Sequence, residues 1–178
     1  MSGHNKWSKI KNKKAVTDAA KSKIFSKMAK LIATASKDAG GDVTSPTLRA
    51  AIEKAKSYNM PTDNIDRAVK KGVGSDAEAM ETIVYEAYGP GGSALVIEAL
   101  TTNRNKAAQE VKHILSKNGF ELAKPGSASW AFIKEPTTND LQPTATVPLS
   151  EEDEKKLEIL IEELEDNEEV QNIYTNAE

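Results

Sequence analysis

Hydrophobic residues in the first part of the chain recur at the three- and four-residue spacing of amphipathic helices. From Thr17 to Ala39 the apolar side chains fall on one face of such a helix, and Gly40-Gly41 ends it. This apolar face consists of Ile24, Phe25, Met28, Leu31, Ile32 and Ala35. Lysines occupy much of the opposite face, so the predicted helix has one side for a protein core and one basic side.

Two shorter helices are predicted to follow. The first begins at Ser45-Pro46, because serine is a good N-cap and proline suits the first helical position, and it ends near Tyr58. The second follows the turn Met60-Pro61-Thr62 and reaches about Lys71, with Gly72 as its stop. Their inward residues are Leu48, Ala51, Ile52, Ala55, Ile65, Ala68 and Val69. Three amphipathic helices with short connections predict a small helical bundle.

Beyond a linker at Gly72–Ser75 the pattern changes to a period of two. Residues 82–88 and 94–100 are expected to be strands, and Gly89-Pro90-Gly91-Gly92 is the hairpin turn between them. A helix is then predicted over residues 105–118, ended by Gly119, with Ala108, Val111 and Leu115 facing inward.

The next segment is expected to hold one more strand and a long loop. The strand covers residues 128–133, with Trp130 and Phe132 on one face. Residues 135–148 contain three prolines and no periodicity, which predicts a loop.

A capping box, Ser150-x-x-Asp153, opens an acidic helix with an inner stripe of Leu157, Leu160, Ile161 and Leu164. Residues 170–175 close the chain as a strand that should join the sheet of the hairpin. The predicted organisation is therefore an arm over residues 1–16, a helical bundle over 17–74 and an α+β domain over 75–178 with an antiparallel sheet.

The net charge of −3 conceals a strong asymmetry along the chain. Residues 1–74 hold 16 Lys+Arg and 6 Asp+Glu, whereas residues 75–178 hold 8 Lys+Arg and 21 Asp+Glu. Charges that only kept the surface soluble would not be sorted by sign in this way. The asymmetry predicts a polyanionic partner for the basic half.

The arm and the basic helix face carry the candidate nucleic-acid contacts. Lysines neutralise phosphates and release counterions, and an aromatic side chain can stack on an unpaired base. The arm supplies Lys6, Trp7, Lys9, Lys11, Lys13 and Lys14, and the helix supplies Lys23, Lys27 and Lys30, with Lys37 on the same basic face. The alternative is a disordered tail whose tryptophan docks on the bundle.

Two further segments allow both a binding and a structural interpretation. Residues 48–71 resemble a helix-turn-helix, but Asp63 and Asp66 would lie at the end that reads base edges, which favours a structural helical hairpin. Asn103 precedes Arg104 and Lys106 between a strand and a helix, where free backbone N–H groups would suit a phosphate. Capping of that helix by Asn103 or Asn105 is equally compatible with the pattern.

The sequence contains no cysteine, which excludes disulfides and thiolate nucleophiles and fits a reducing compartment. Its two histidines, His4 and His113, are too few to suggest a metal site. Glu86 and Glu98 could serve acid–base chemistry, but they fit surface-facing strand residues better. We therefore expect a protein that is not an enzyme, with no cofactor, metal or small-molecule substrate.

The longest strongly apolar run, Ala94–Ile97, is far too short to cross a bilayer, and no apolar segment follows the first residues. A cytoplasmic protein without a membrane partner is expected.

Four segments resemble the YebC family, which includes a mitochondrial translational activator of cytochrome c oxidase subunit I. They are Gly3-His4-Asn5-Lys6-Trp7, Lys23-Ile24-Phe25, Tyr85-Glu86-Ala87-Tyr88-Gly89-Pro90-Gly91-Gly92 and Asn103-Arg104-Asn105-Lys106. The resemblance covers about residues 1–134 and resumes near Val147. It implies a helical N-terminal domain followed by ferredoxin-like α/β domains.

The chain departs from the family pattern where members usually insert a second α/β domain after Lys134, since only the loop 135–148 stands there. The resemblance implies a regulator of gene expression, and family members are described both as DNA-binding transcriptional regulators and as translation factors. Lysines spread along an arm and a helix face suit backbone contact with a large folded RNA. We therefore predict ribosomal RNA as the partner, with promoter DNA as the alternative.

Overall fold

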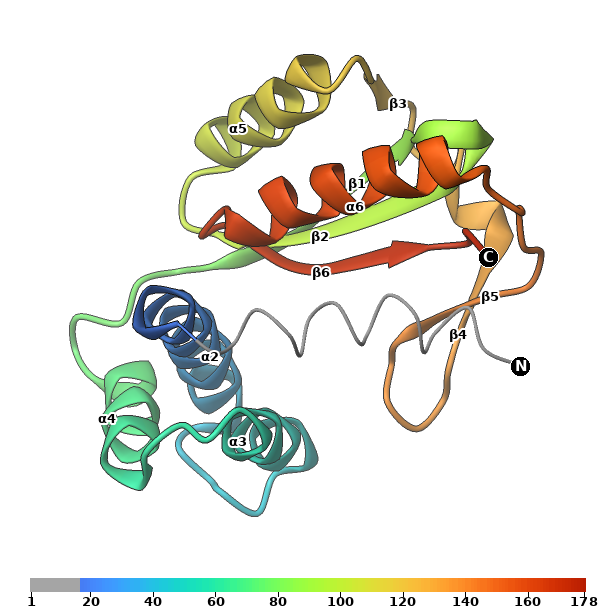
Figure 1. Ribbon diagram of the computed structural model, residues 1–178. Helices are drawn as coiled ribbons and strands as arrows, with labels where there is room; N and C mark the ends of the chain where they lie inside the picture. Colours follow the sequence, from blue (N-terminus) through green and yellow to red (C-terminus); the bar gives the residue numbers. More distant parts are fainter. Residues whose placement is uncertain (1–16) are drawn as a thin grey trace. The chain divides into compact units, whose positions relative to one another are not determined.

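The computed structural model describes residues 17–178 (Figure 1). Contacts divide this part of the chain into two units, one that ends at Glu81 and one that runs from Thr82 to Glu178.

The first unit is built from three helices, as the sequence predicted. They are α2 (Asp18–Ala39), α3 (Pro46–Ser57) and α4 (Thr62–Val73). The hydroxyl of Thr17 accepts the N–H of Ala20 at 3.2 Å and so caps α2, and Gly40 ends it in the left-handed conformation (φ 61°). The buried apolar side chains of the three helices form one core: Met28, Ile32, Ala35, Leu48, Ala51, Ala55, Met60, Ile65 and Ala68.

Two local predictions for this unit are wrong. Gly72 does not stop α4 but lies inside it, buried against α2, and the helix continues to Val73. Ser45 occupies the N-cap position of α3 but makes no capping hydrogen bond with its side chain. Pro46 at the first helical position has no N–H to satisfy, and it fixes the backbone for the helix without that bond.

The second unit is a two-layer α+β structure, which confirms the predicted fold class. Its elements are β1 (Glu81–Tyr88), β2 (Ala94–Thr101), α5 (Arg104–Lys117), β3 (Leu122–Ala123), β4 (Phe132–Lys134), β5 (Leu141–Pro143), α6 (Glu151–Asp166) and β6 (Val170–Thr175). The main sheet has the order β3-β1-β2-β6, and α5 and α6 cover one of its faces (Figure 1).

The last strand joins the sheet of the hairpin, as predicted. β6 pairs antiparallel with β2, from Leu95 opposite Thr175 to Ala99 opposite Val170, with an irregularity between Glu98 and Ala99. The core beneath the two helices contains all four leucine and isoleucine positions of the predicted α6 stripe. On α5, Val111 and Leu115 are buried as predicted, but in the first turn Ala107 is buried and Ala108 is only half-buried.

The segment after β3 differs most from its prediction. Residues 129–131 form a 3₁₀ turn before β4, so Trp130 is 62% exposed while Phe132 is buried, and the two do not share a face. The expected loop 135–148 contains β5, which pairs antiparallel with β4 in a separate two-stranded sheet. Phe132 packs there with Ala94 and Val96 on the sheet face opposite the helices.

Glu86 explains this arrangement. Its carboxylate accepts the N–H groups of Gly126, Ala128 and Ser129, which bend the chain into the turn before β4. Glu86 is only 6% exposed, so the expectation of a surface-facing residue is wrong for it. Glu98 is half-buried and accepts the side-chain amide of Asn172 at 3.0 Å.

Candidate nucleic-acid interface

The predicted contacts in the arm lie outside the described residues: Lys6, Trp7, Lys9, Lys11, Lys13 and Lys14. In the described part of the chain the candidate contacts belong to two units, with some on α2 and α4 of the helical unit and others at the start of α5 in the α+β unit.

Helix α2 presents its lysines unevenly. Lys37 is exposed, Lys23 and Lys30 are half-buried, and Lys27 is buried with 9% of its surface exposed. The expected place of Lys27 on a solvent-facing basic stripe is thus wrong. Its position lies only 40° around the helix from Leu31, at the border of the apolar stripe, where a lysine stem packs against apolar neighbours.

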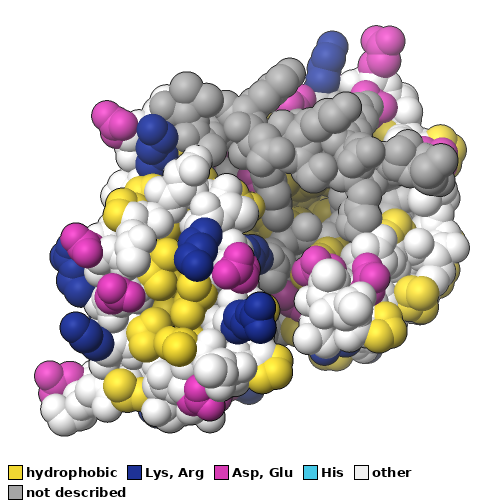
Figure 2. Space-filling view, turned by 90° about the horizontal axis from the view of Figure 1, so that it is seen from below, with side chains coloured by type: hydrophobic (Ala, Val, Ile, Leu, Met, Phe, Trp, Pro, Cys, Tyr) yellow, Lys and Arg dark blue, Asp and Glu magenta, His cyan; other side chains and the backbone are white. Residues whose placement is uncertain are grey.

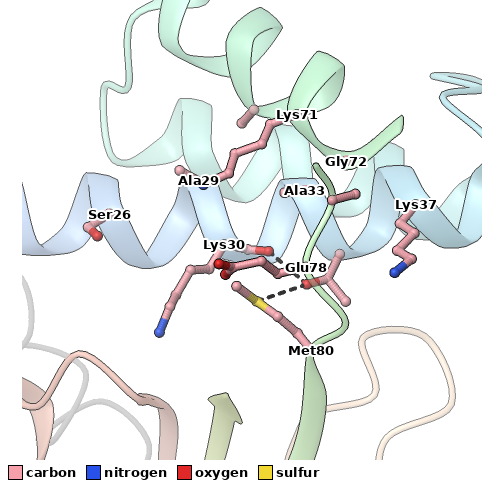
Figure 3. Close-up of a pocket in the computed structure, with 12 residues that line it drawn as sticks. Ser26, Ala29, Lys30, Ala33, Lys37, Lys71, Gly72, Glu78 and Met80 are labelled. Carbon is pink, nitrogen blue, oxygen red and sulfur yellow. Dashed lines mark hydrogen bonds between the residues drawn. The ribbon is translucent and has the colours of Figure 1, made fainter. Parts of the chain in front are cut away.

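A groove of about 260 Å³ lies between α2, α4 and the segment that leads to β1 (Figure 3). Small residues form its walls: Ala29 and Ala33 on α2, and Ala68 and Gly72 on α4. A β-carbon on Gly72 would overlap the carbonyl oxygen of Ala33, so the two helices approach as closely as a glycine allows.

Three lysines from two helices surround this groove: Lys30, Lys37 and Lys71. Glu78 is the one acidic residue among the lining residues. Thr34 also lines the groove, and its hydroxyl donates to the carbonyl oxygen of Lys30 at 2.9 Å and contacts the sulfur of Met80 at 3.6 Å. The groove therefore combines an apolar interior with a positively charged rim.

The basic character of the helical unit is local. Residues 17–81 hold 11 Lys+Arg and 9 Asp+Glu, so much of the asymmetry in the sequence comes from residues 1–16. In Figure 2, apolar side chains on the side of α3 and α4 have both basic and acidic neighbours. Three of the 11 cationic residues of this unit, Lys30, Lys37 and Lys71, line the groove.

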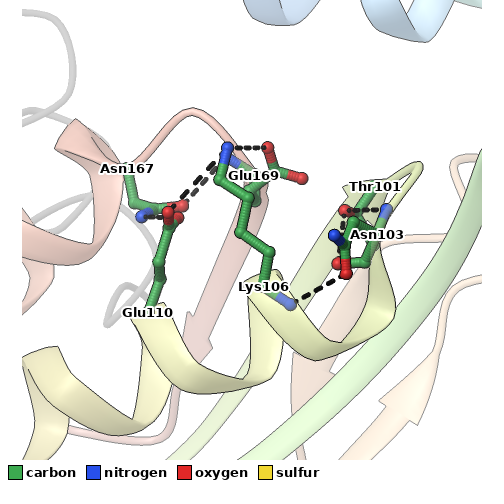
Figure 4. A network of polar contacts seen from close by, with 6 residues as sticks. All are labelled: Thr101, Asn103, Lys106, Glu110, Asn167 and Glu169. Atoms are coloured by element: carbon green, nitrogen blue, oxygen red, sulfur yellow. Dashed lines mark hydrogen bonds and ion pairs between the residues drawn. The ribbon is translucent and has the colours of Figure 1, made fainter.

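The start of α5 is arranged differently from the rim of the groove. The Lys106 ammonium lies 3.4 Å from a carboxylate oxygen of Glu169 and 3.9 Å from one of Glu110 (Figure 4). Glu169 is 7% exposed, so Lys106 compensates a buried carboxylate. Asn103 caps α5 by accepting the N–H of Lys106 at 3.1 Å. Arg104 is exposed and stays a candidate contact.

Helices α3 and α4 meet through a turn with the features of a helix-turn-helix. Asn59 adopts a left-handed conformation (φ 61°), and Met60 and Ile65 are buried. Asp63 and Asp66 are exposed at the start of α4, where that motif would meet a base edge.

Sequence reasoning missed the roles of Lys71, Glu78 and Thr34. No pattern singled out Lys71, because the sequence predicted that Gly72 beside it ends the helix. The path of residues 74–80, which no periodicity encodes, brings Glu78 and Met80 to the groove, where they meet Thr34 of α2.

The described residues contain no group of three or more histidine, aspartate and glutamate side chains that could hold a metal ion. Among the same residues, no helix is long and apolar enough to cross a membrane.

The fold therefore defines a two-unit protein, in which a three-helix unit precedes an antiparallel α+β unit. The model of the TACO1/YebC protein N-terminal domain matches residues 5–75, and that of the TACO1/YebC second and third domain matches residues 80–137 and 133–177. The chain therefore belongs to the TACO1/YebC family.

Similar proteins carry one recurrent description. A probable transcriptional regulatory protein of Caldanaerobacter subterraneus is 36% identical over 239 residues, covering all of this chain and 98% of that protein. One from Fervidobacterium nodosum is 54% identical over 134 residues, covering 74% of this chain. That match spans 53% of the relative, so the chain covers about half the length of several curated relatives.

The fold also matches a solved structure. A conserved hypothetical protein of Aquifex aeolicus superimposes with a TM-score of 0.78 and 29% sequence identity, covering 90% of this chain and 91% of the other.

Proposed function

We propose that this protein is a non-enzymatic regulator of gene expression that binds nucleic acid through its N-terminal helical unit, with ribosomal RNA as its target. Relatives named as probable transcriptional regulatory proteins support a role in gene expression. A role in transcription implies a nucleic-acid partner, and the charge distribution of this chain also favours one.

The observation that carries the proposal is the gathering of Lys30, Lys37 and Lys71 around one groove. Cations from two helices that converge on a concave surface suit a phosphate backbone, because each neutralised phosphate releases counterions. The lysine at the start of α5 is instead committed to carboxylates, so the helical unit is the better binding side.

Ribosomal RNA is favoured by the kind and the placing of these charges. Lysine is a flexible point charge suited to backbone contact, whereas readout of a duplex base relies on side chains at the edge of a groove. The exposed Asp63 and Asp66 at the start of α4 would face the polyanion at that edge.

The second candidate is a DNA-binding transcriptional regulator. The left-handed Asn59 and the buried Met60 give α3 and α4 a turn like that of a helix-turn-helix. This reading requires the start of α4 to enter a major groove despite its two carboxylates.

A regulator without catalysis is proposed because the carboxylates considered for chemistry already have structural partners. Glu86 accepts three backbone N–H groups and Glu98 accepts Asn172. The double variant Glu98→Gln with His113→Asn should keep the cellular phenotype. Loss of that phenotype with intact folding and RNA binding would favour a hydrolase instead.

Cosedimentation of the full chain with ribosomes over a series of salt concentrations tests the proposal. The bound fraction should fall steeply as salt rises, because several lysine–phosphate contacts are lost together. A protein that stays off ribosomes and protects one DNA sequence far better than its scrambled control would support the transcriptional candidate. Binding to neither nucleic acid would reject the proposal and favour a protein–protein adaptor.

A further inference from the structure

We propose that the groove between α2 and α4 holds a single unpaired RNA nucleotide, with the base inside the groove and its two flanking phosphates at Lys37 and Lys71, and that Glu78 selects a base with an amino group. This inference rests on the proposed function and assigns a specific site to it.

The size of the groove fits one base. Its volume of about 260 Å³ lies just below the roughly 300–1,000 Å³ of pockets that hold drug-sized ligands. It is open along one side, so a base can enter while its sugar and phosphate stay outside. Recognition of RNA commonly uses unpaired bases that are splayed out of the strand in this way.

The interior suits the face of an aromatic ring. Ala29, Ala33 and Ala77 supply flat walls without long side chains, and Met80 supplies a polarisable sulfur. Sulfur–aromatic contacts are favourable, and the contact with the Thr34 hydroxyl at 3.6 Å holds this thioether in place. A ring inserted here would replace water against apolar atoms on both of its faces.

The rim supplies the charge for the phosphate. Lys37 and Lys71 are both exposed, and no ion pair joins either to a carboxylate of residues 17–178. Figure 3 shows Lys71 reaching from α4 toward Ala29, while Lys37 leaves α2 about one turn beyond Ala33 at the other end of the groove. The two phosphates that flank the nucleotide, one at each end of the groove, would each have a cation within reach without the loss of an existing ion pair.

Glu78 gives the site its selectivity. A carboxylate accepts hydrogen bonds only, and it pairs with the exocyclic amino group of cytosine. Uracil presents a carbonyl oxygen at the same ring position, so two acceptors would face each other. The two pyrimidines have nearly the same size, and their comparison therefore isolates the contribution of Glu78.

Fluorescence anisotropy with labelled single-stranded oligoribonucleotides of cytidine or uridine, equal in length and at one fixed salt concentration and neutral pH, tests the site in the full chain. Oligocytidine should bind at least about fivefold more tightly than oligouridine, and Glu78→Gln should bring the two within about twofold, because an amide both donates and accepts. Oligodeoxycytidine that binds as tightly as oligocytidine would overturn the choice of RNA.

A matched pair of lysine variants separates the groove from general charge. Lys71→Ala should weaken oligocytidine binding about tenfold. Lys70→Ala should change it less than twofold, because Lys70 has the same charge in the same turn of α4 and does not line the groove. Circular dichroism checks that each variant is folded.

The results also separate this site from the proposed function. Equal losses for Lys70→Ala and Lys71→Ala, or no preference for cytidine in the unaltered chain, would overturn the nucleotide site while RNA binding itself stands. A chain that binds no RNA at any salt would overturn both.

Discussion

Gly72 of α4 lies directly against the carbonyl oxygen of Ala33 in α2, with no room for a side chain between the two helices. A β-carbon on Gly72 would also come within 2.7 Å of the β-carbon of Ser36. The Ser36 hydroxyl donates to the carbonyl oxygen of Val69 at 2.7 Å and ties the helices together at the same level. This close approach brings Lys71 to the wall of small residues on α2 and thereby forms the groove.

Replacing Gly72 by alanine should destabilise the helical unit by up to about 2 kcal/mol. The overlap with Ala33 costs roughly 1–3 kcal/mol, and the higher helix propensity of alanine offsets about 1 kcal/mol of that cost. Urea unfolding followed by circular dichroism measures the difference. Gly74→Ala is the control, because its β-carbon would make only ordinary contacts at 3.5 Å and should shift stability by no more than about 0.5 kcal/mol.

Replacing Glu86 by glutamine should destabilise the α+β unit by about 1–3 kcal/mol. The amide can present one oxygen to Ala128 and Ser129, but its NH₂ group then faces the N–H of Gly126, which leaves a buried donor without an acceptor. Glu98→Gln should cost at most about 1 kcal/mol, since a glutamine oxygen still accepts Asn172. Equal losses for the two variants would contradict the anchoring role of Glu86.

The same carboxylate should make the stability of this unit depend on acid pH. Burial is the largest single influence on the pKa of Glu86 and raises it, but the N–H groups of Gly126, Ser129 and Ala128 together place the pKa below its ordinary 4.5. A group whose pKa is lower in the folded state stabilises the fold above its unfolded pKa, and that contribution fades as pH falls toward the folded pKa. Urea midpoints measured between about pH 6 and pH 3 should fall less in Glu86→Gln than in the unaltered chain.

Local patterns predicted the helices and most of their inward faces. The stripe of α6 and its Ser150 cap are confirmed, because both are set by residues within one or two turns. The sheet partner of β6 also followed from the pattern, since a closing strand next to an antiparallel hairpin has few places to pair.

The errors share a physical cause, which is a partner far along the chain. Glycine commonly ends helices, so the sequence alone predicts that Gly72 ends α4. It lies inside α4 because the helix passes so close to the Ala33 carbonyl that only a glycine fits there. Glu86 alternates as a surface residue would, yet its carboxylate accepts hydrogen bonds from N–H groups about 40 residues later. The turn that they hold places Trp130 outward, against the strand pattern.

Lys106 distinguishes a phosphate site at α5 from a structural ion pair. Lys106→Met should lower stability by about 1 kcal/mol, because the buried Glu169 loses its ammonium partner while Lys106 itself is half-exposed. The affinity of the Lys106→Met variant for ribosomes should stay within about twofold of that of the unaltered chain. Lys112→Met, an exposed lysine on the same helix, should change neither quantity. Ribosome binding that weakens in Lys106→Met but not in Lys112→Met would instead support a phosphate at the start of α5.

The lysines of the arm should dominate the salt dependence of ribosome binding. Each neutralised phosphate contributes about 0.7–0.9 to the slope of log affinity against log salt. Replacing Lys9, Lys11, Lys13 and Lys14 by alanine should therefore flatten that slope by roughly three to four units if all four contact RNA. Cosedimentation over a salt series measures the slope directly.

A second fourfold variant shows whether position or only charge matters for that slope. Lys112, Lys124, Lys134 and Lys155 are exposed lysines of the acidic half, and their replacement by alanine removes the same total charge. Because they lie outside the proposed binding unit, the slope should change by less than about one unit. Equal flattening in both variants would mean that ribosomes respond to net charge alone, and an unchanged slope in the arm variant would place the phosphate contacts elsewhere in the chain.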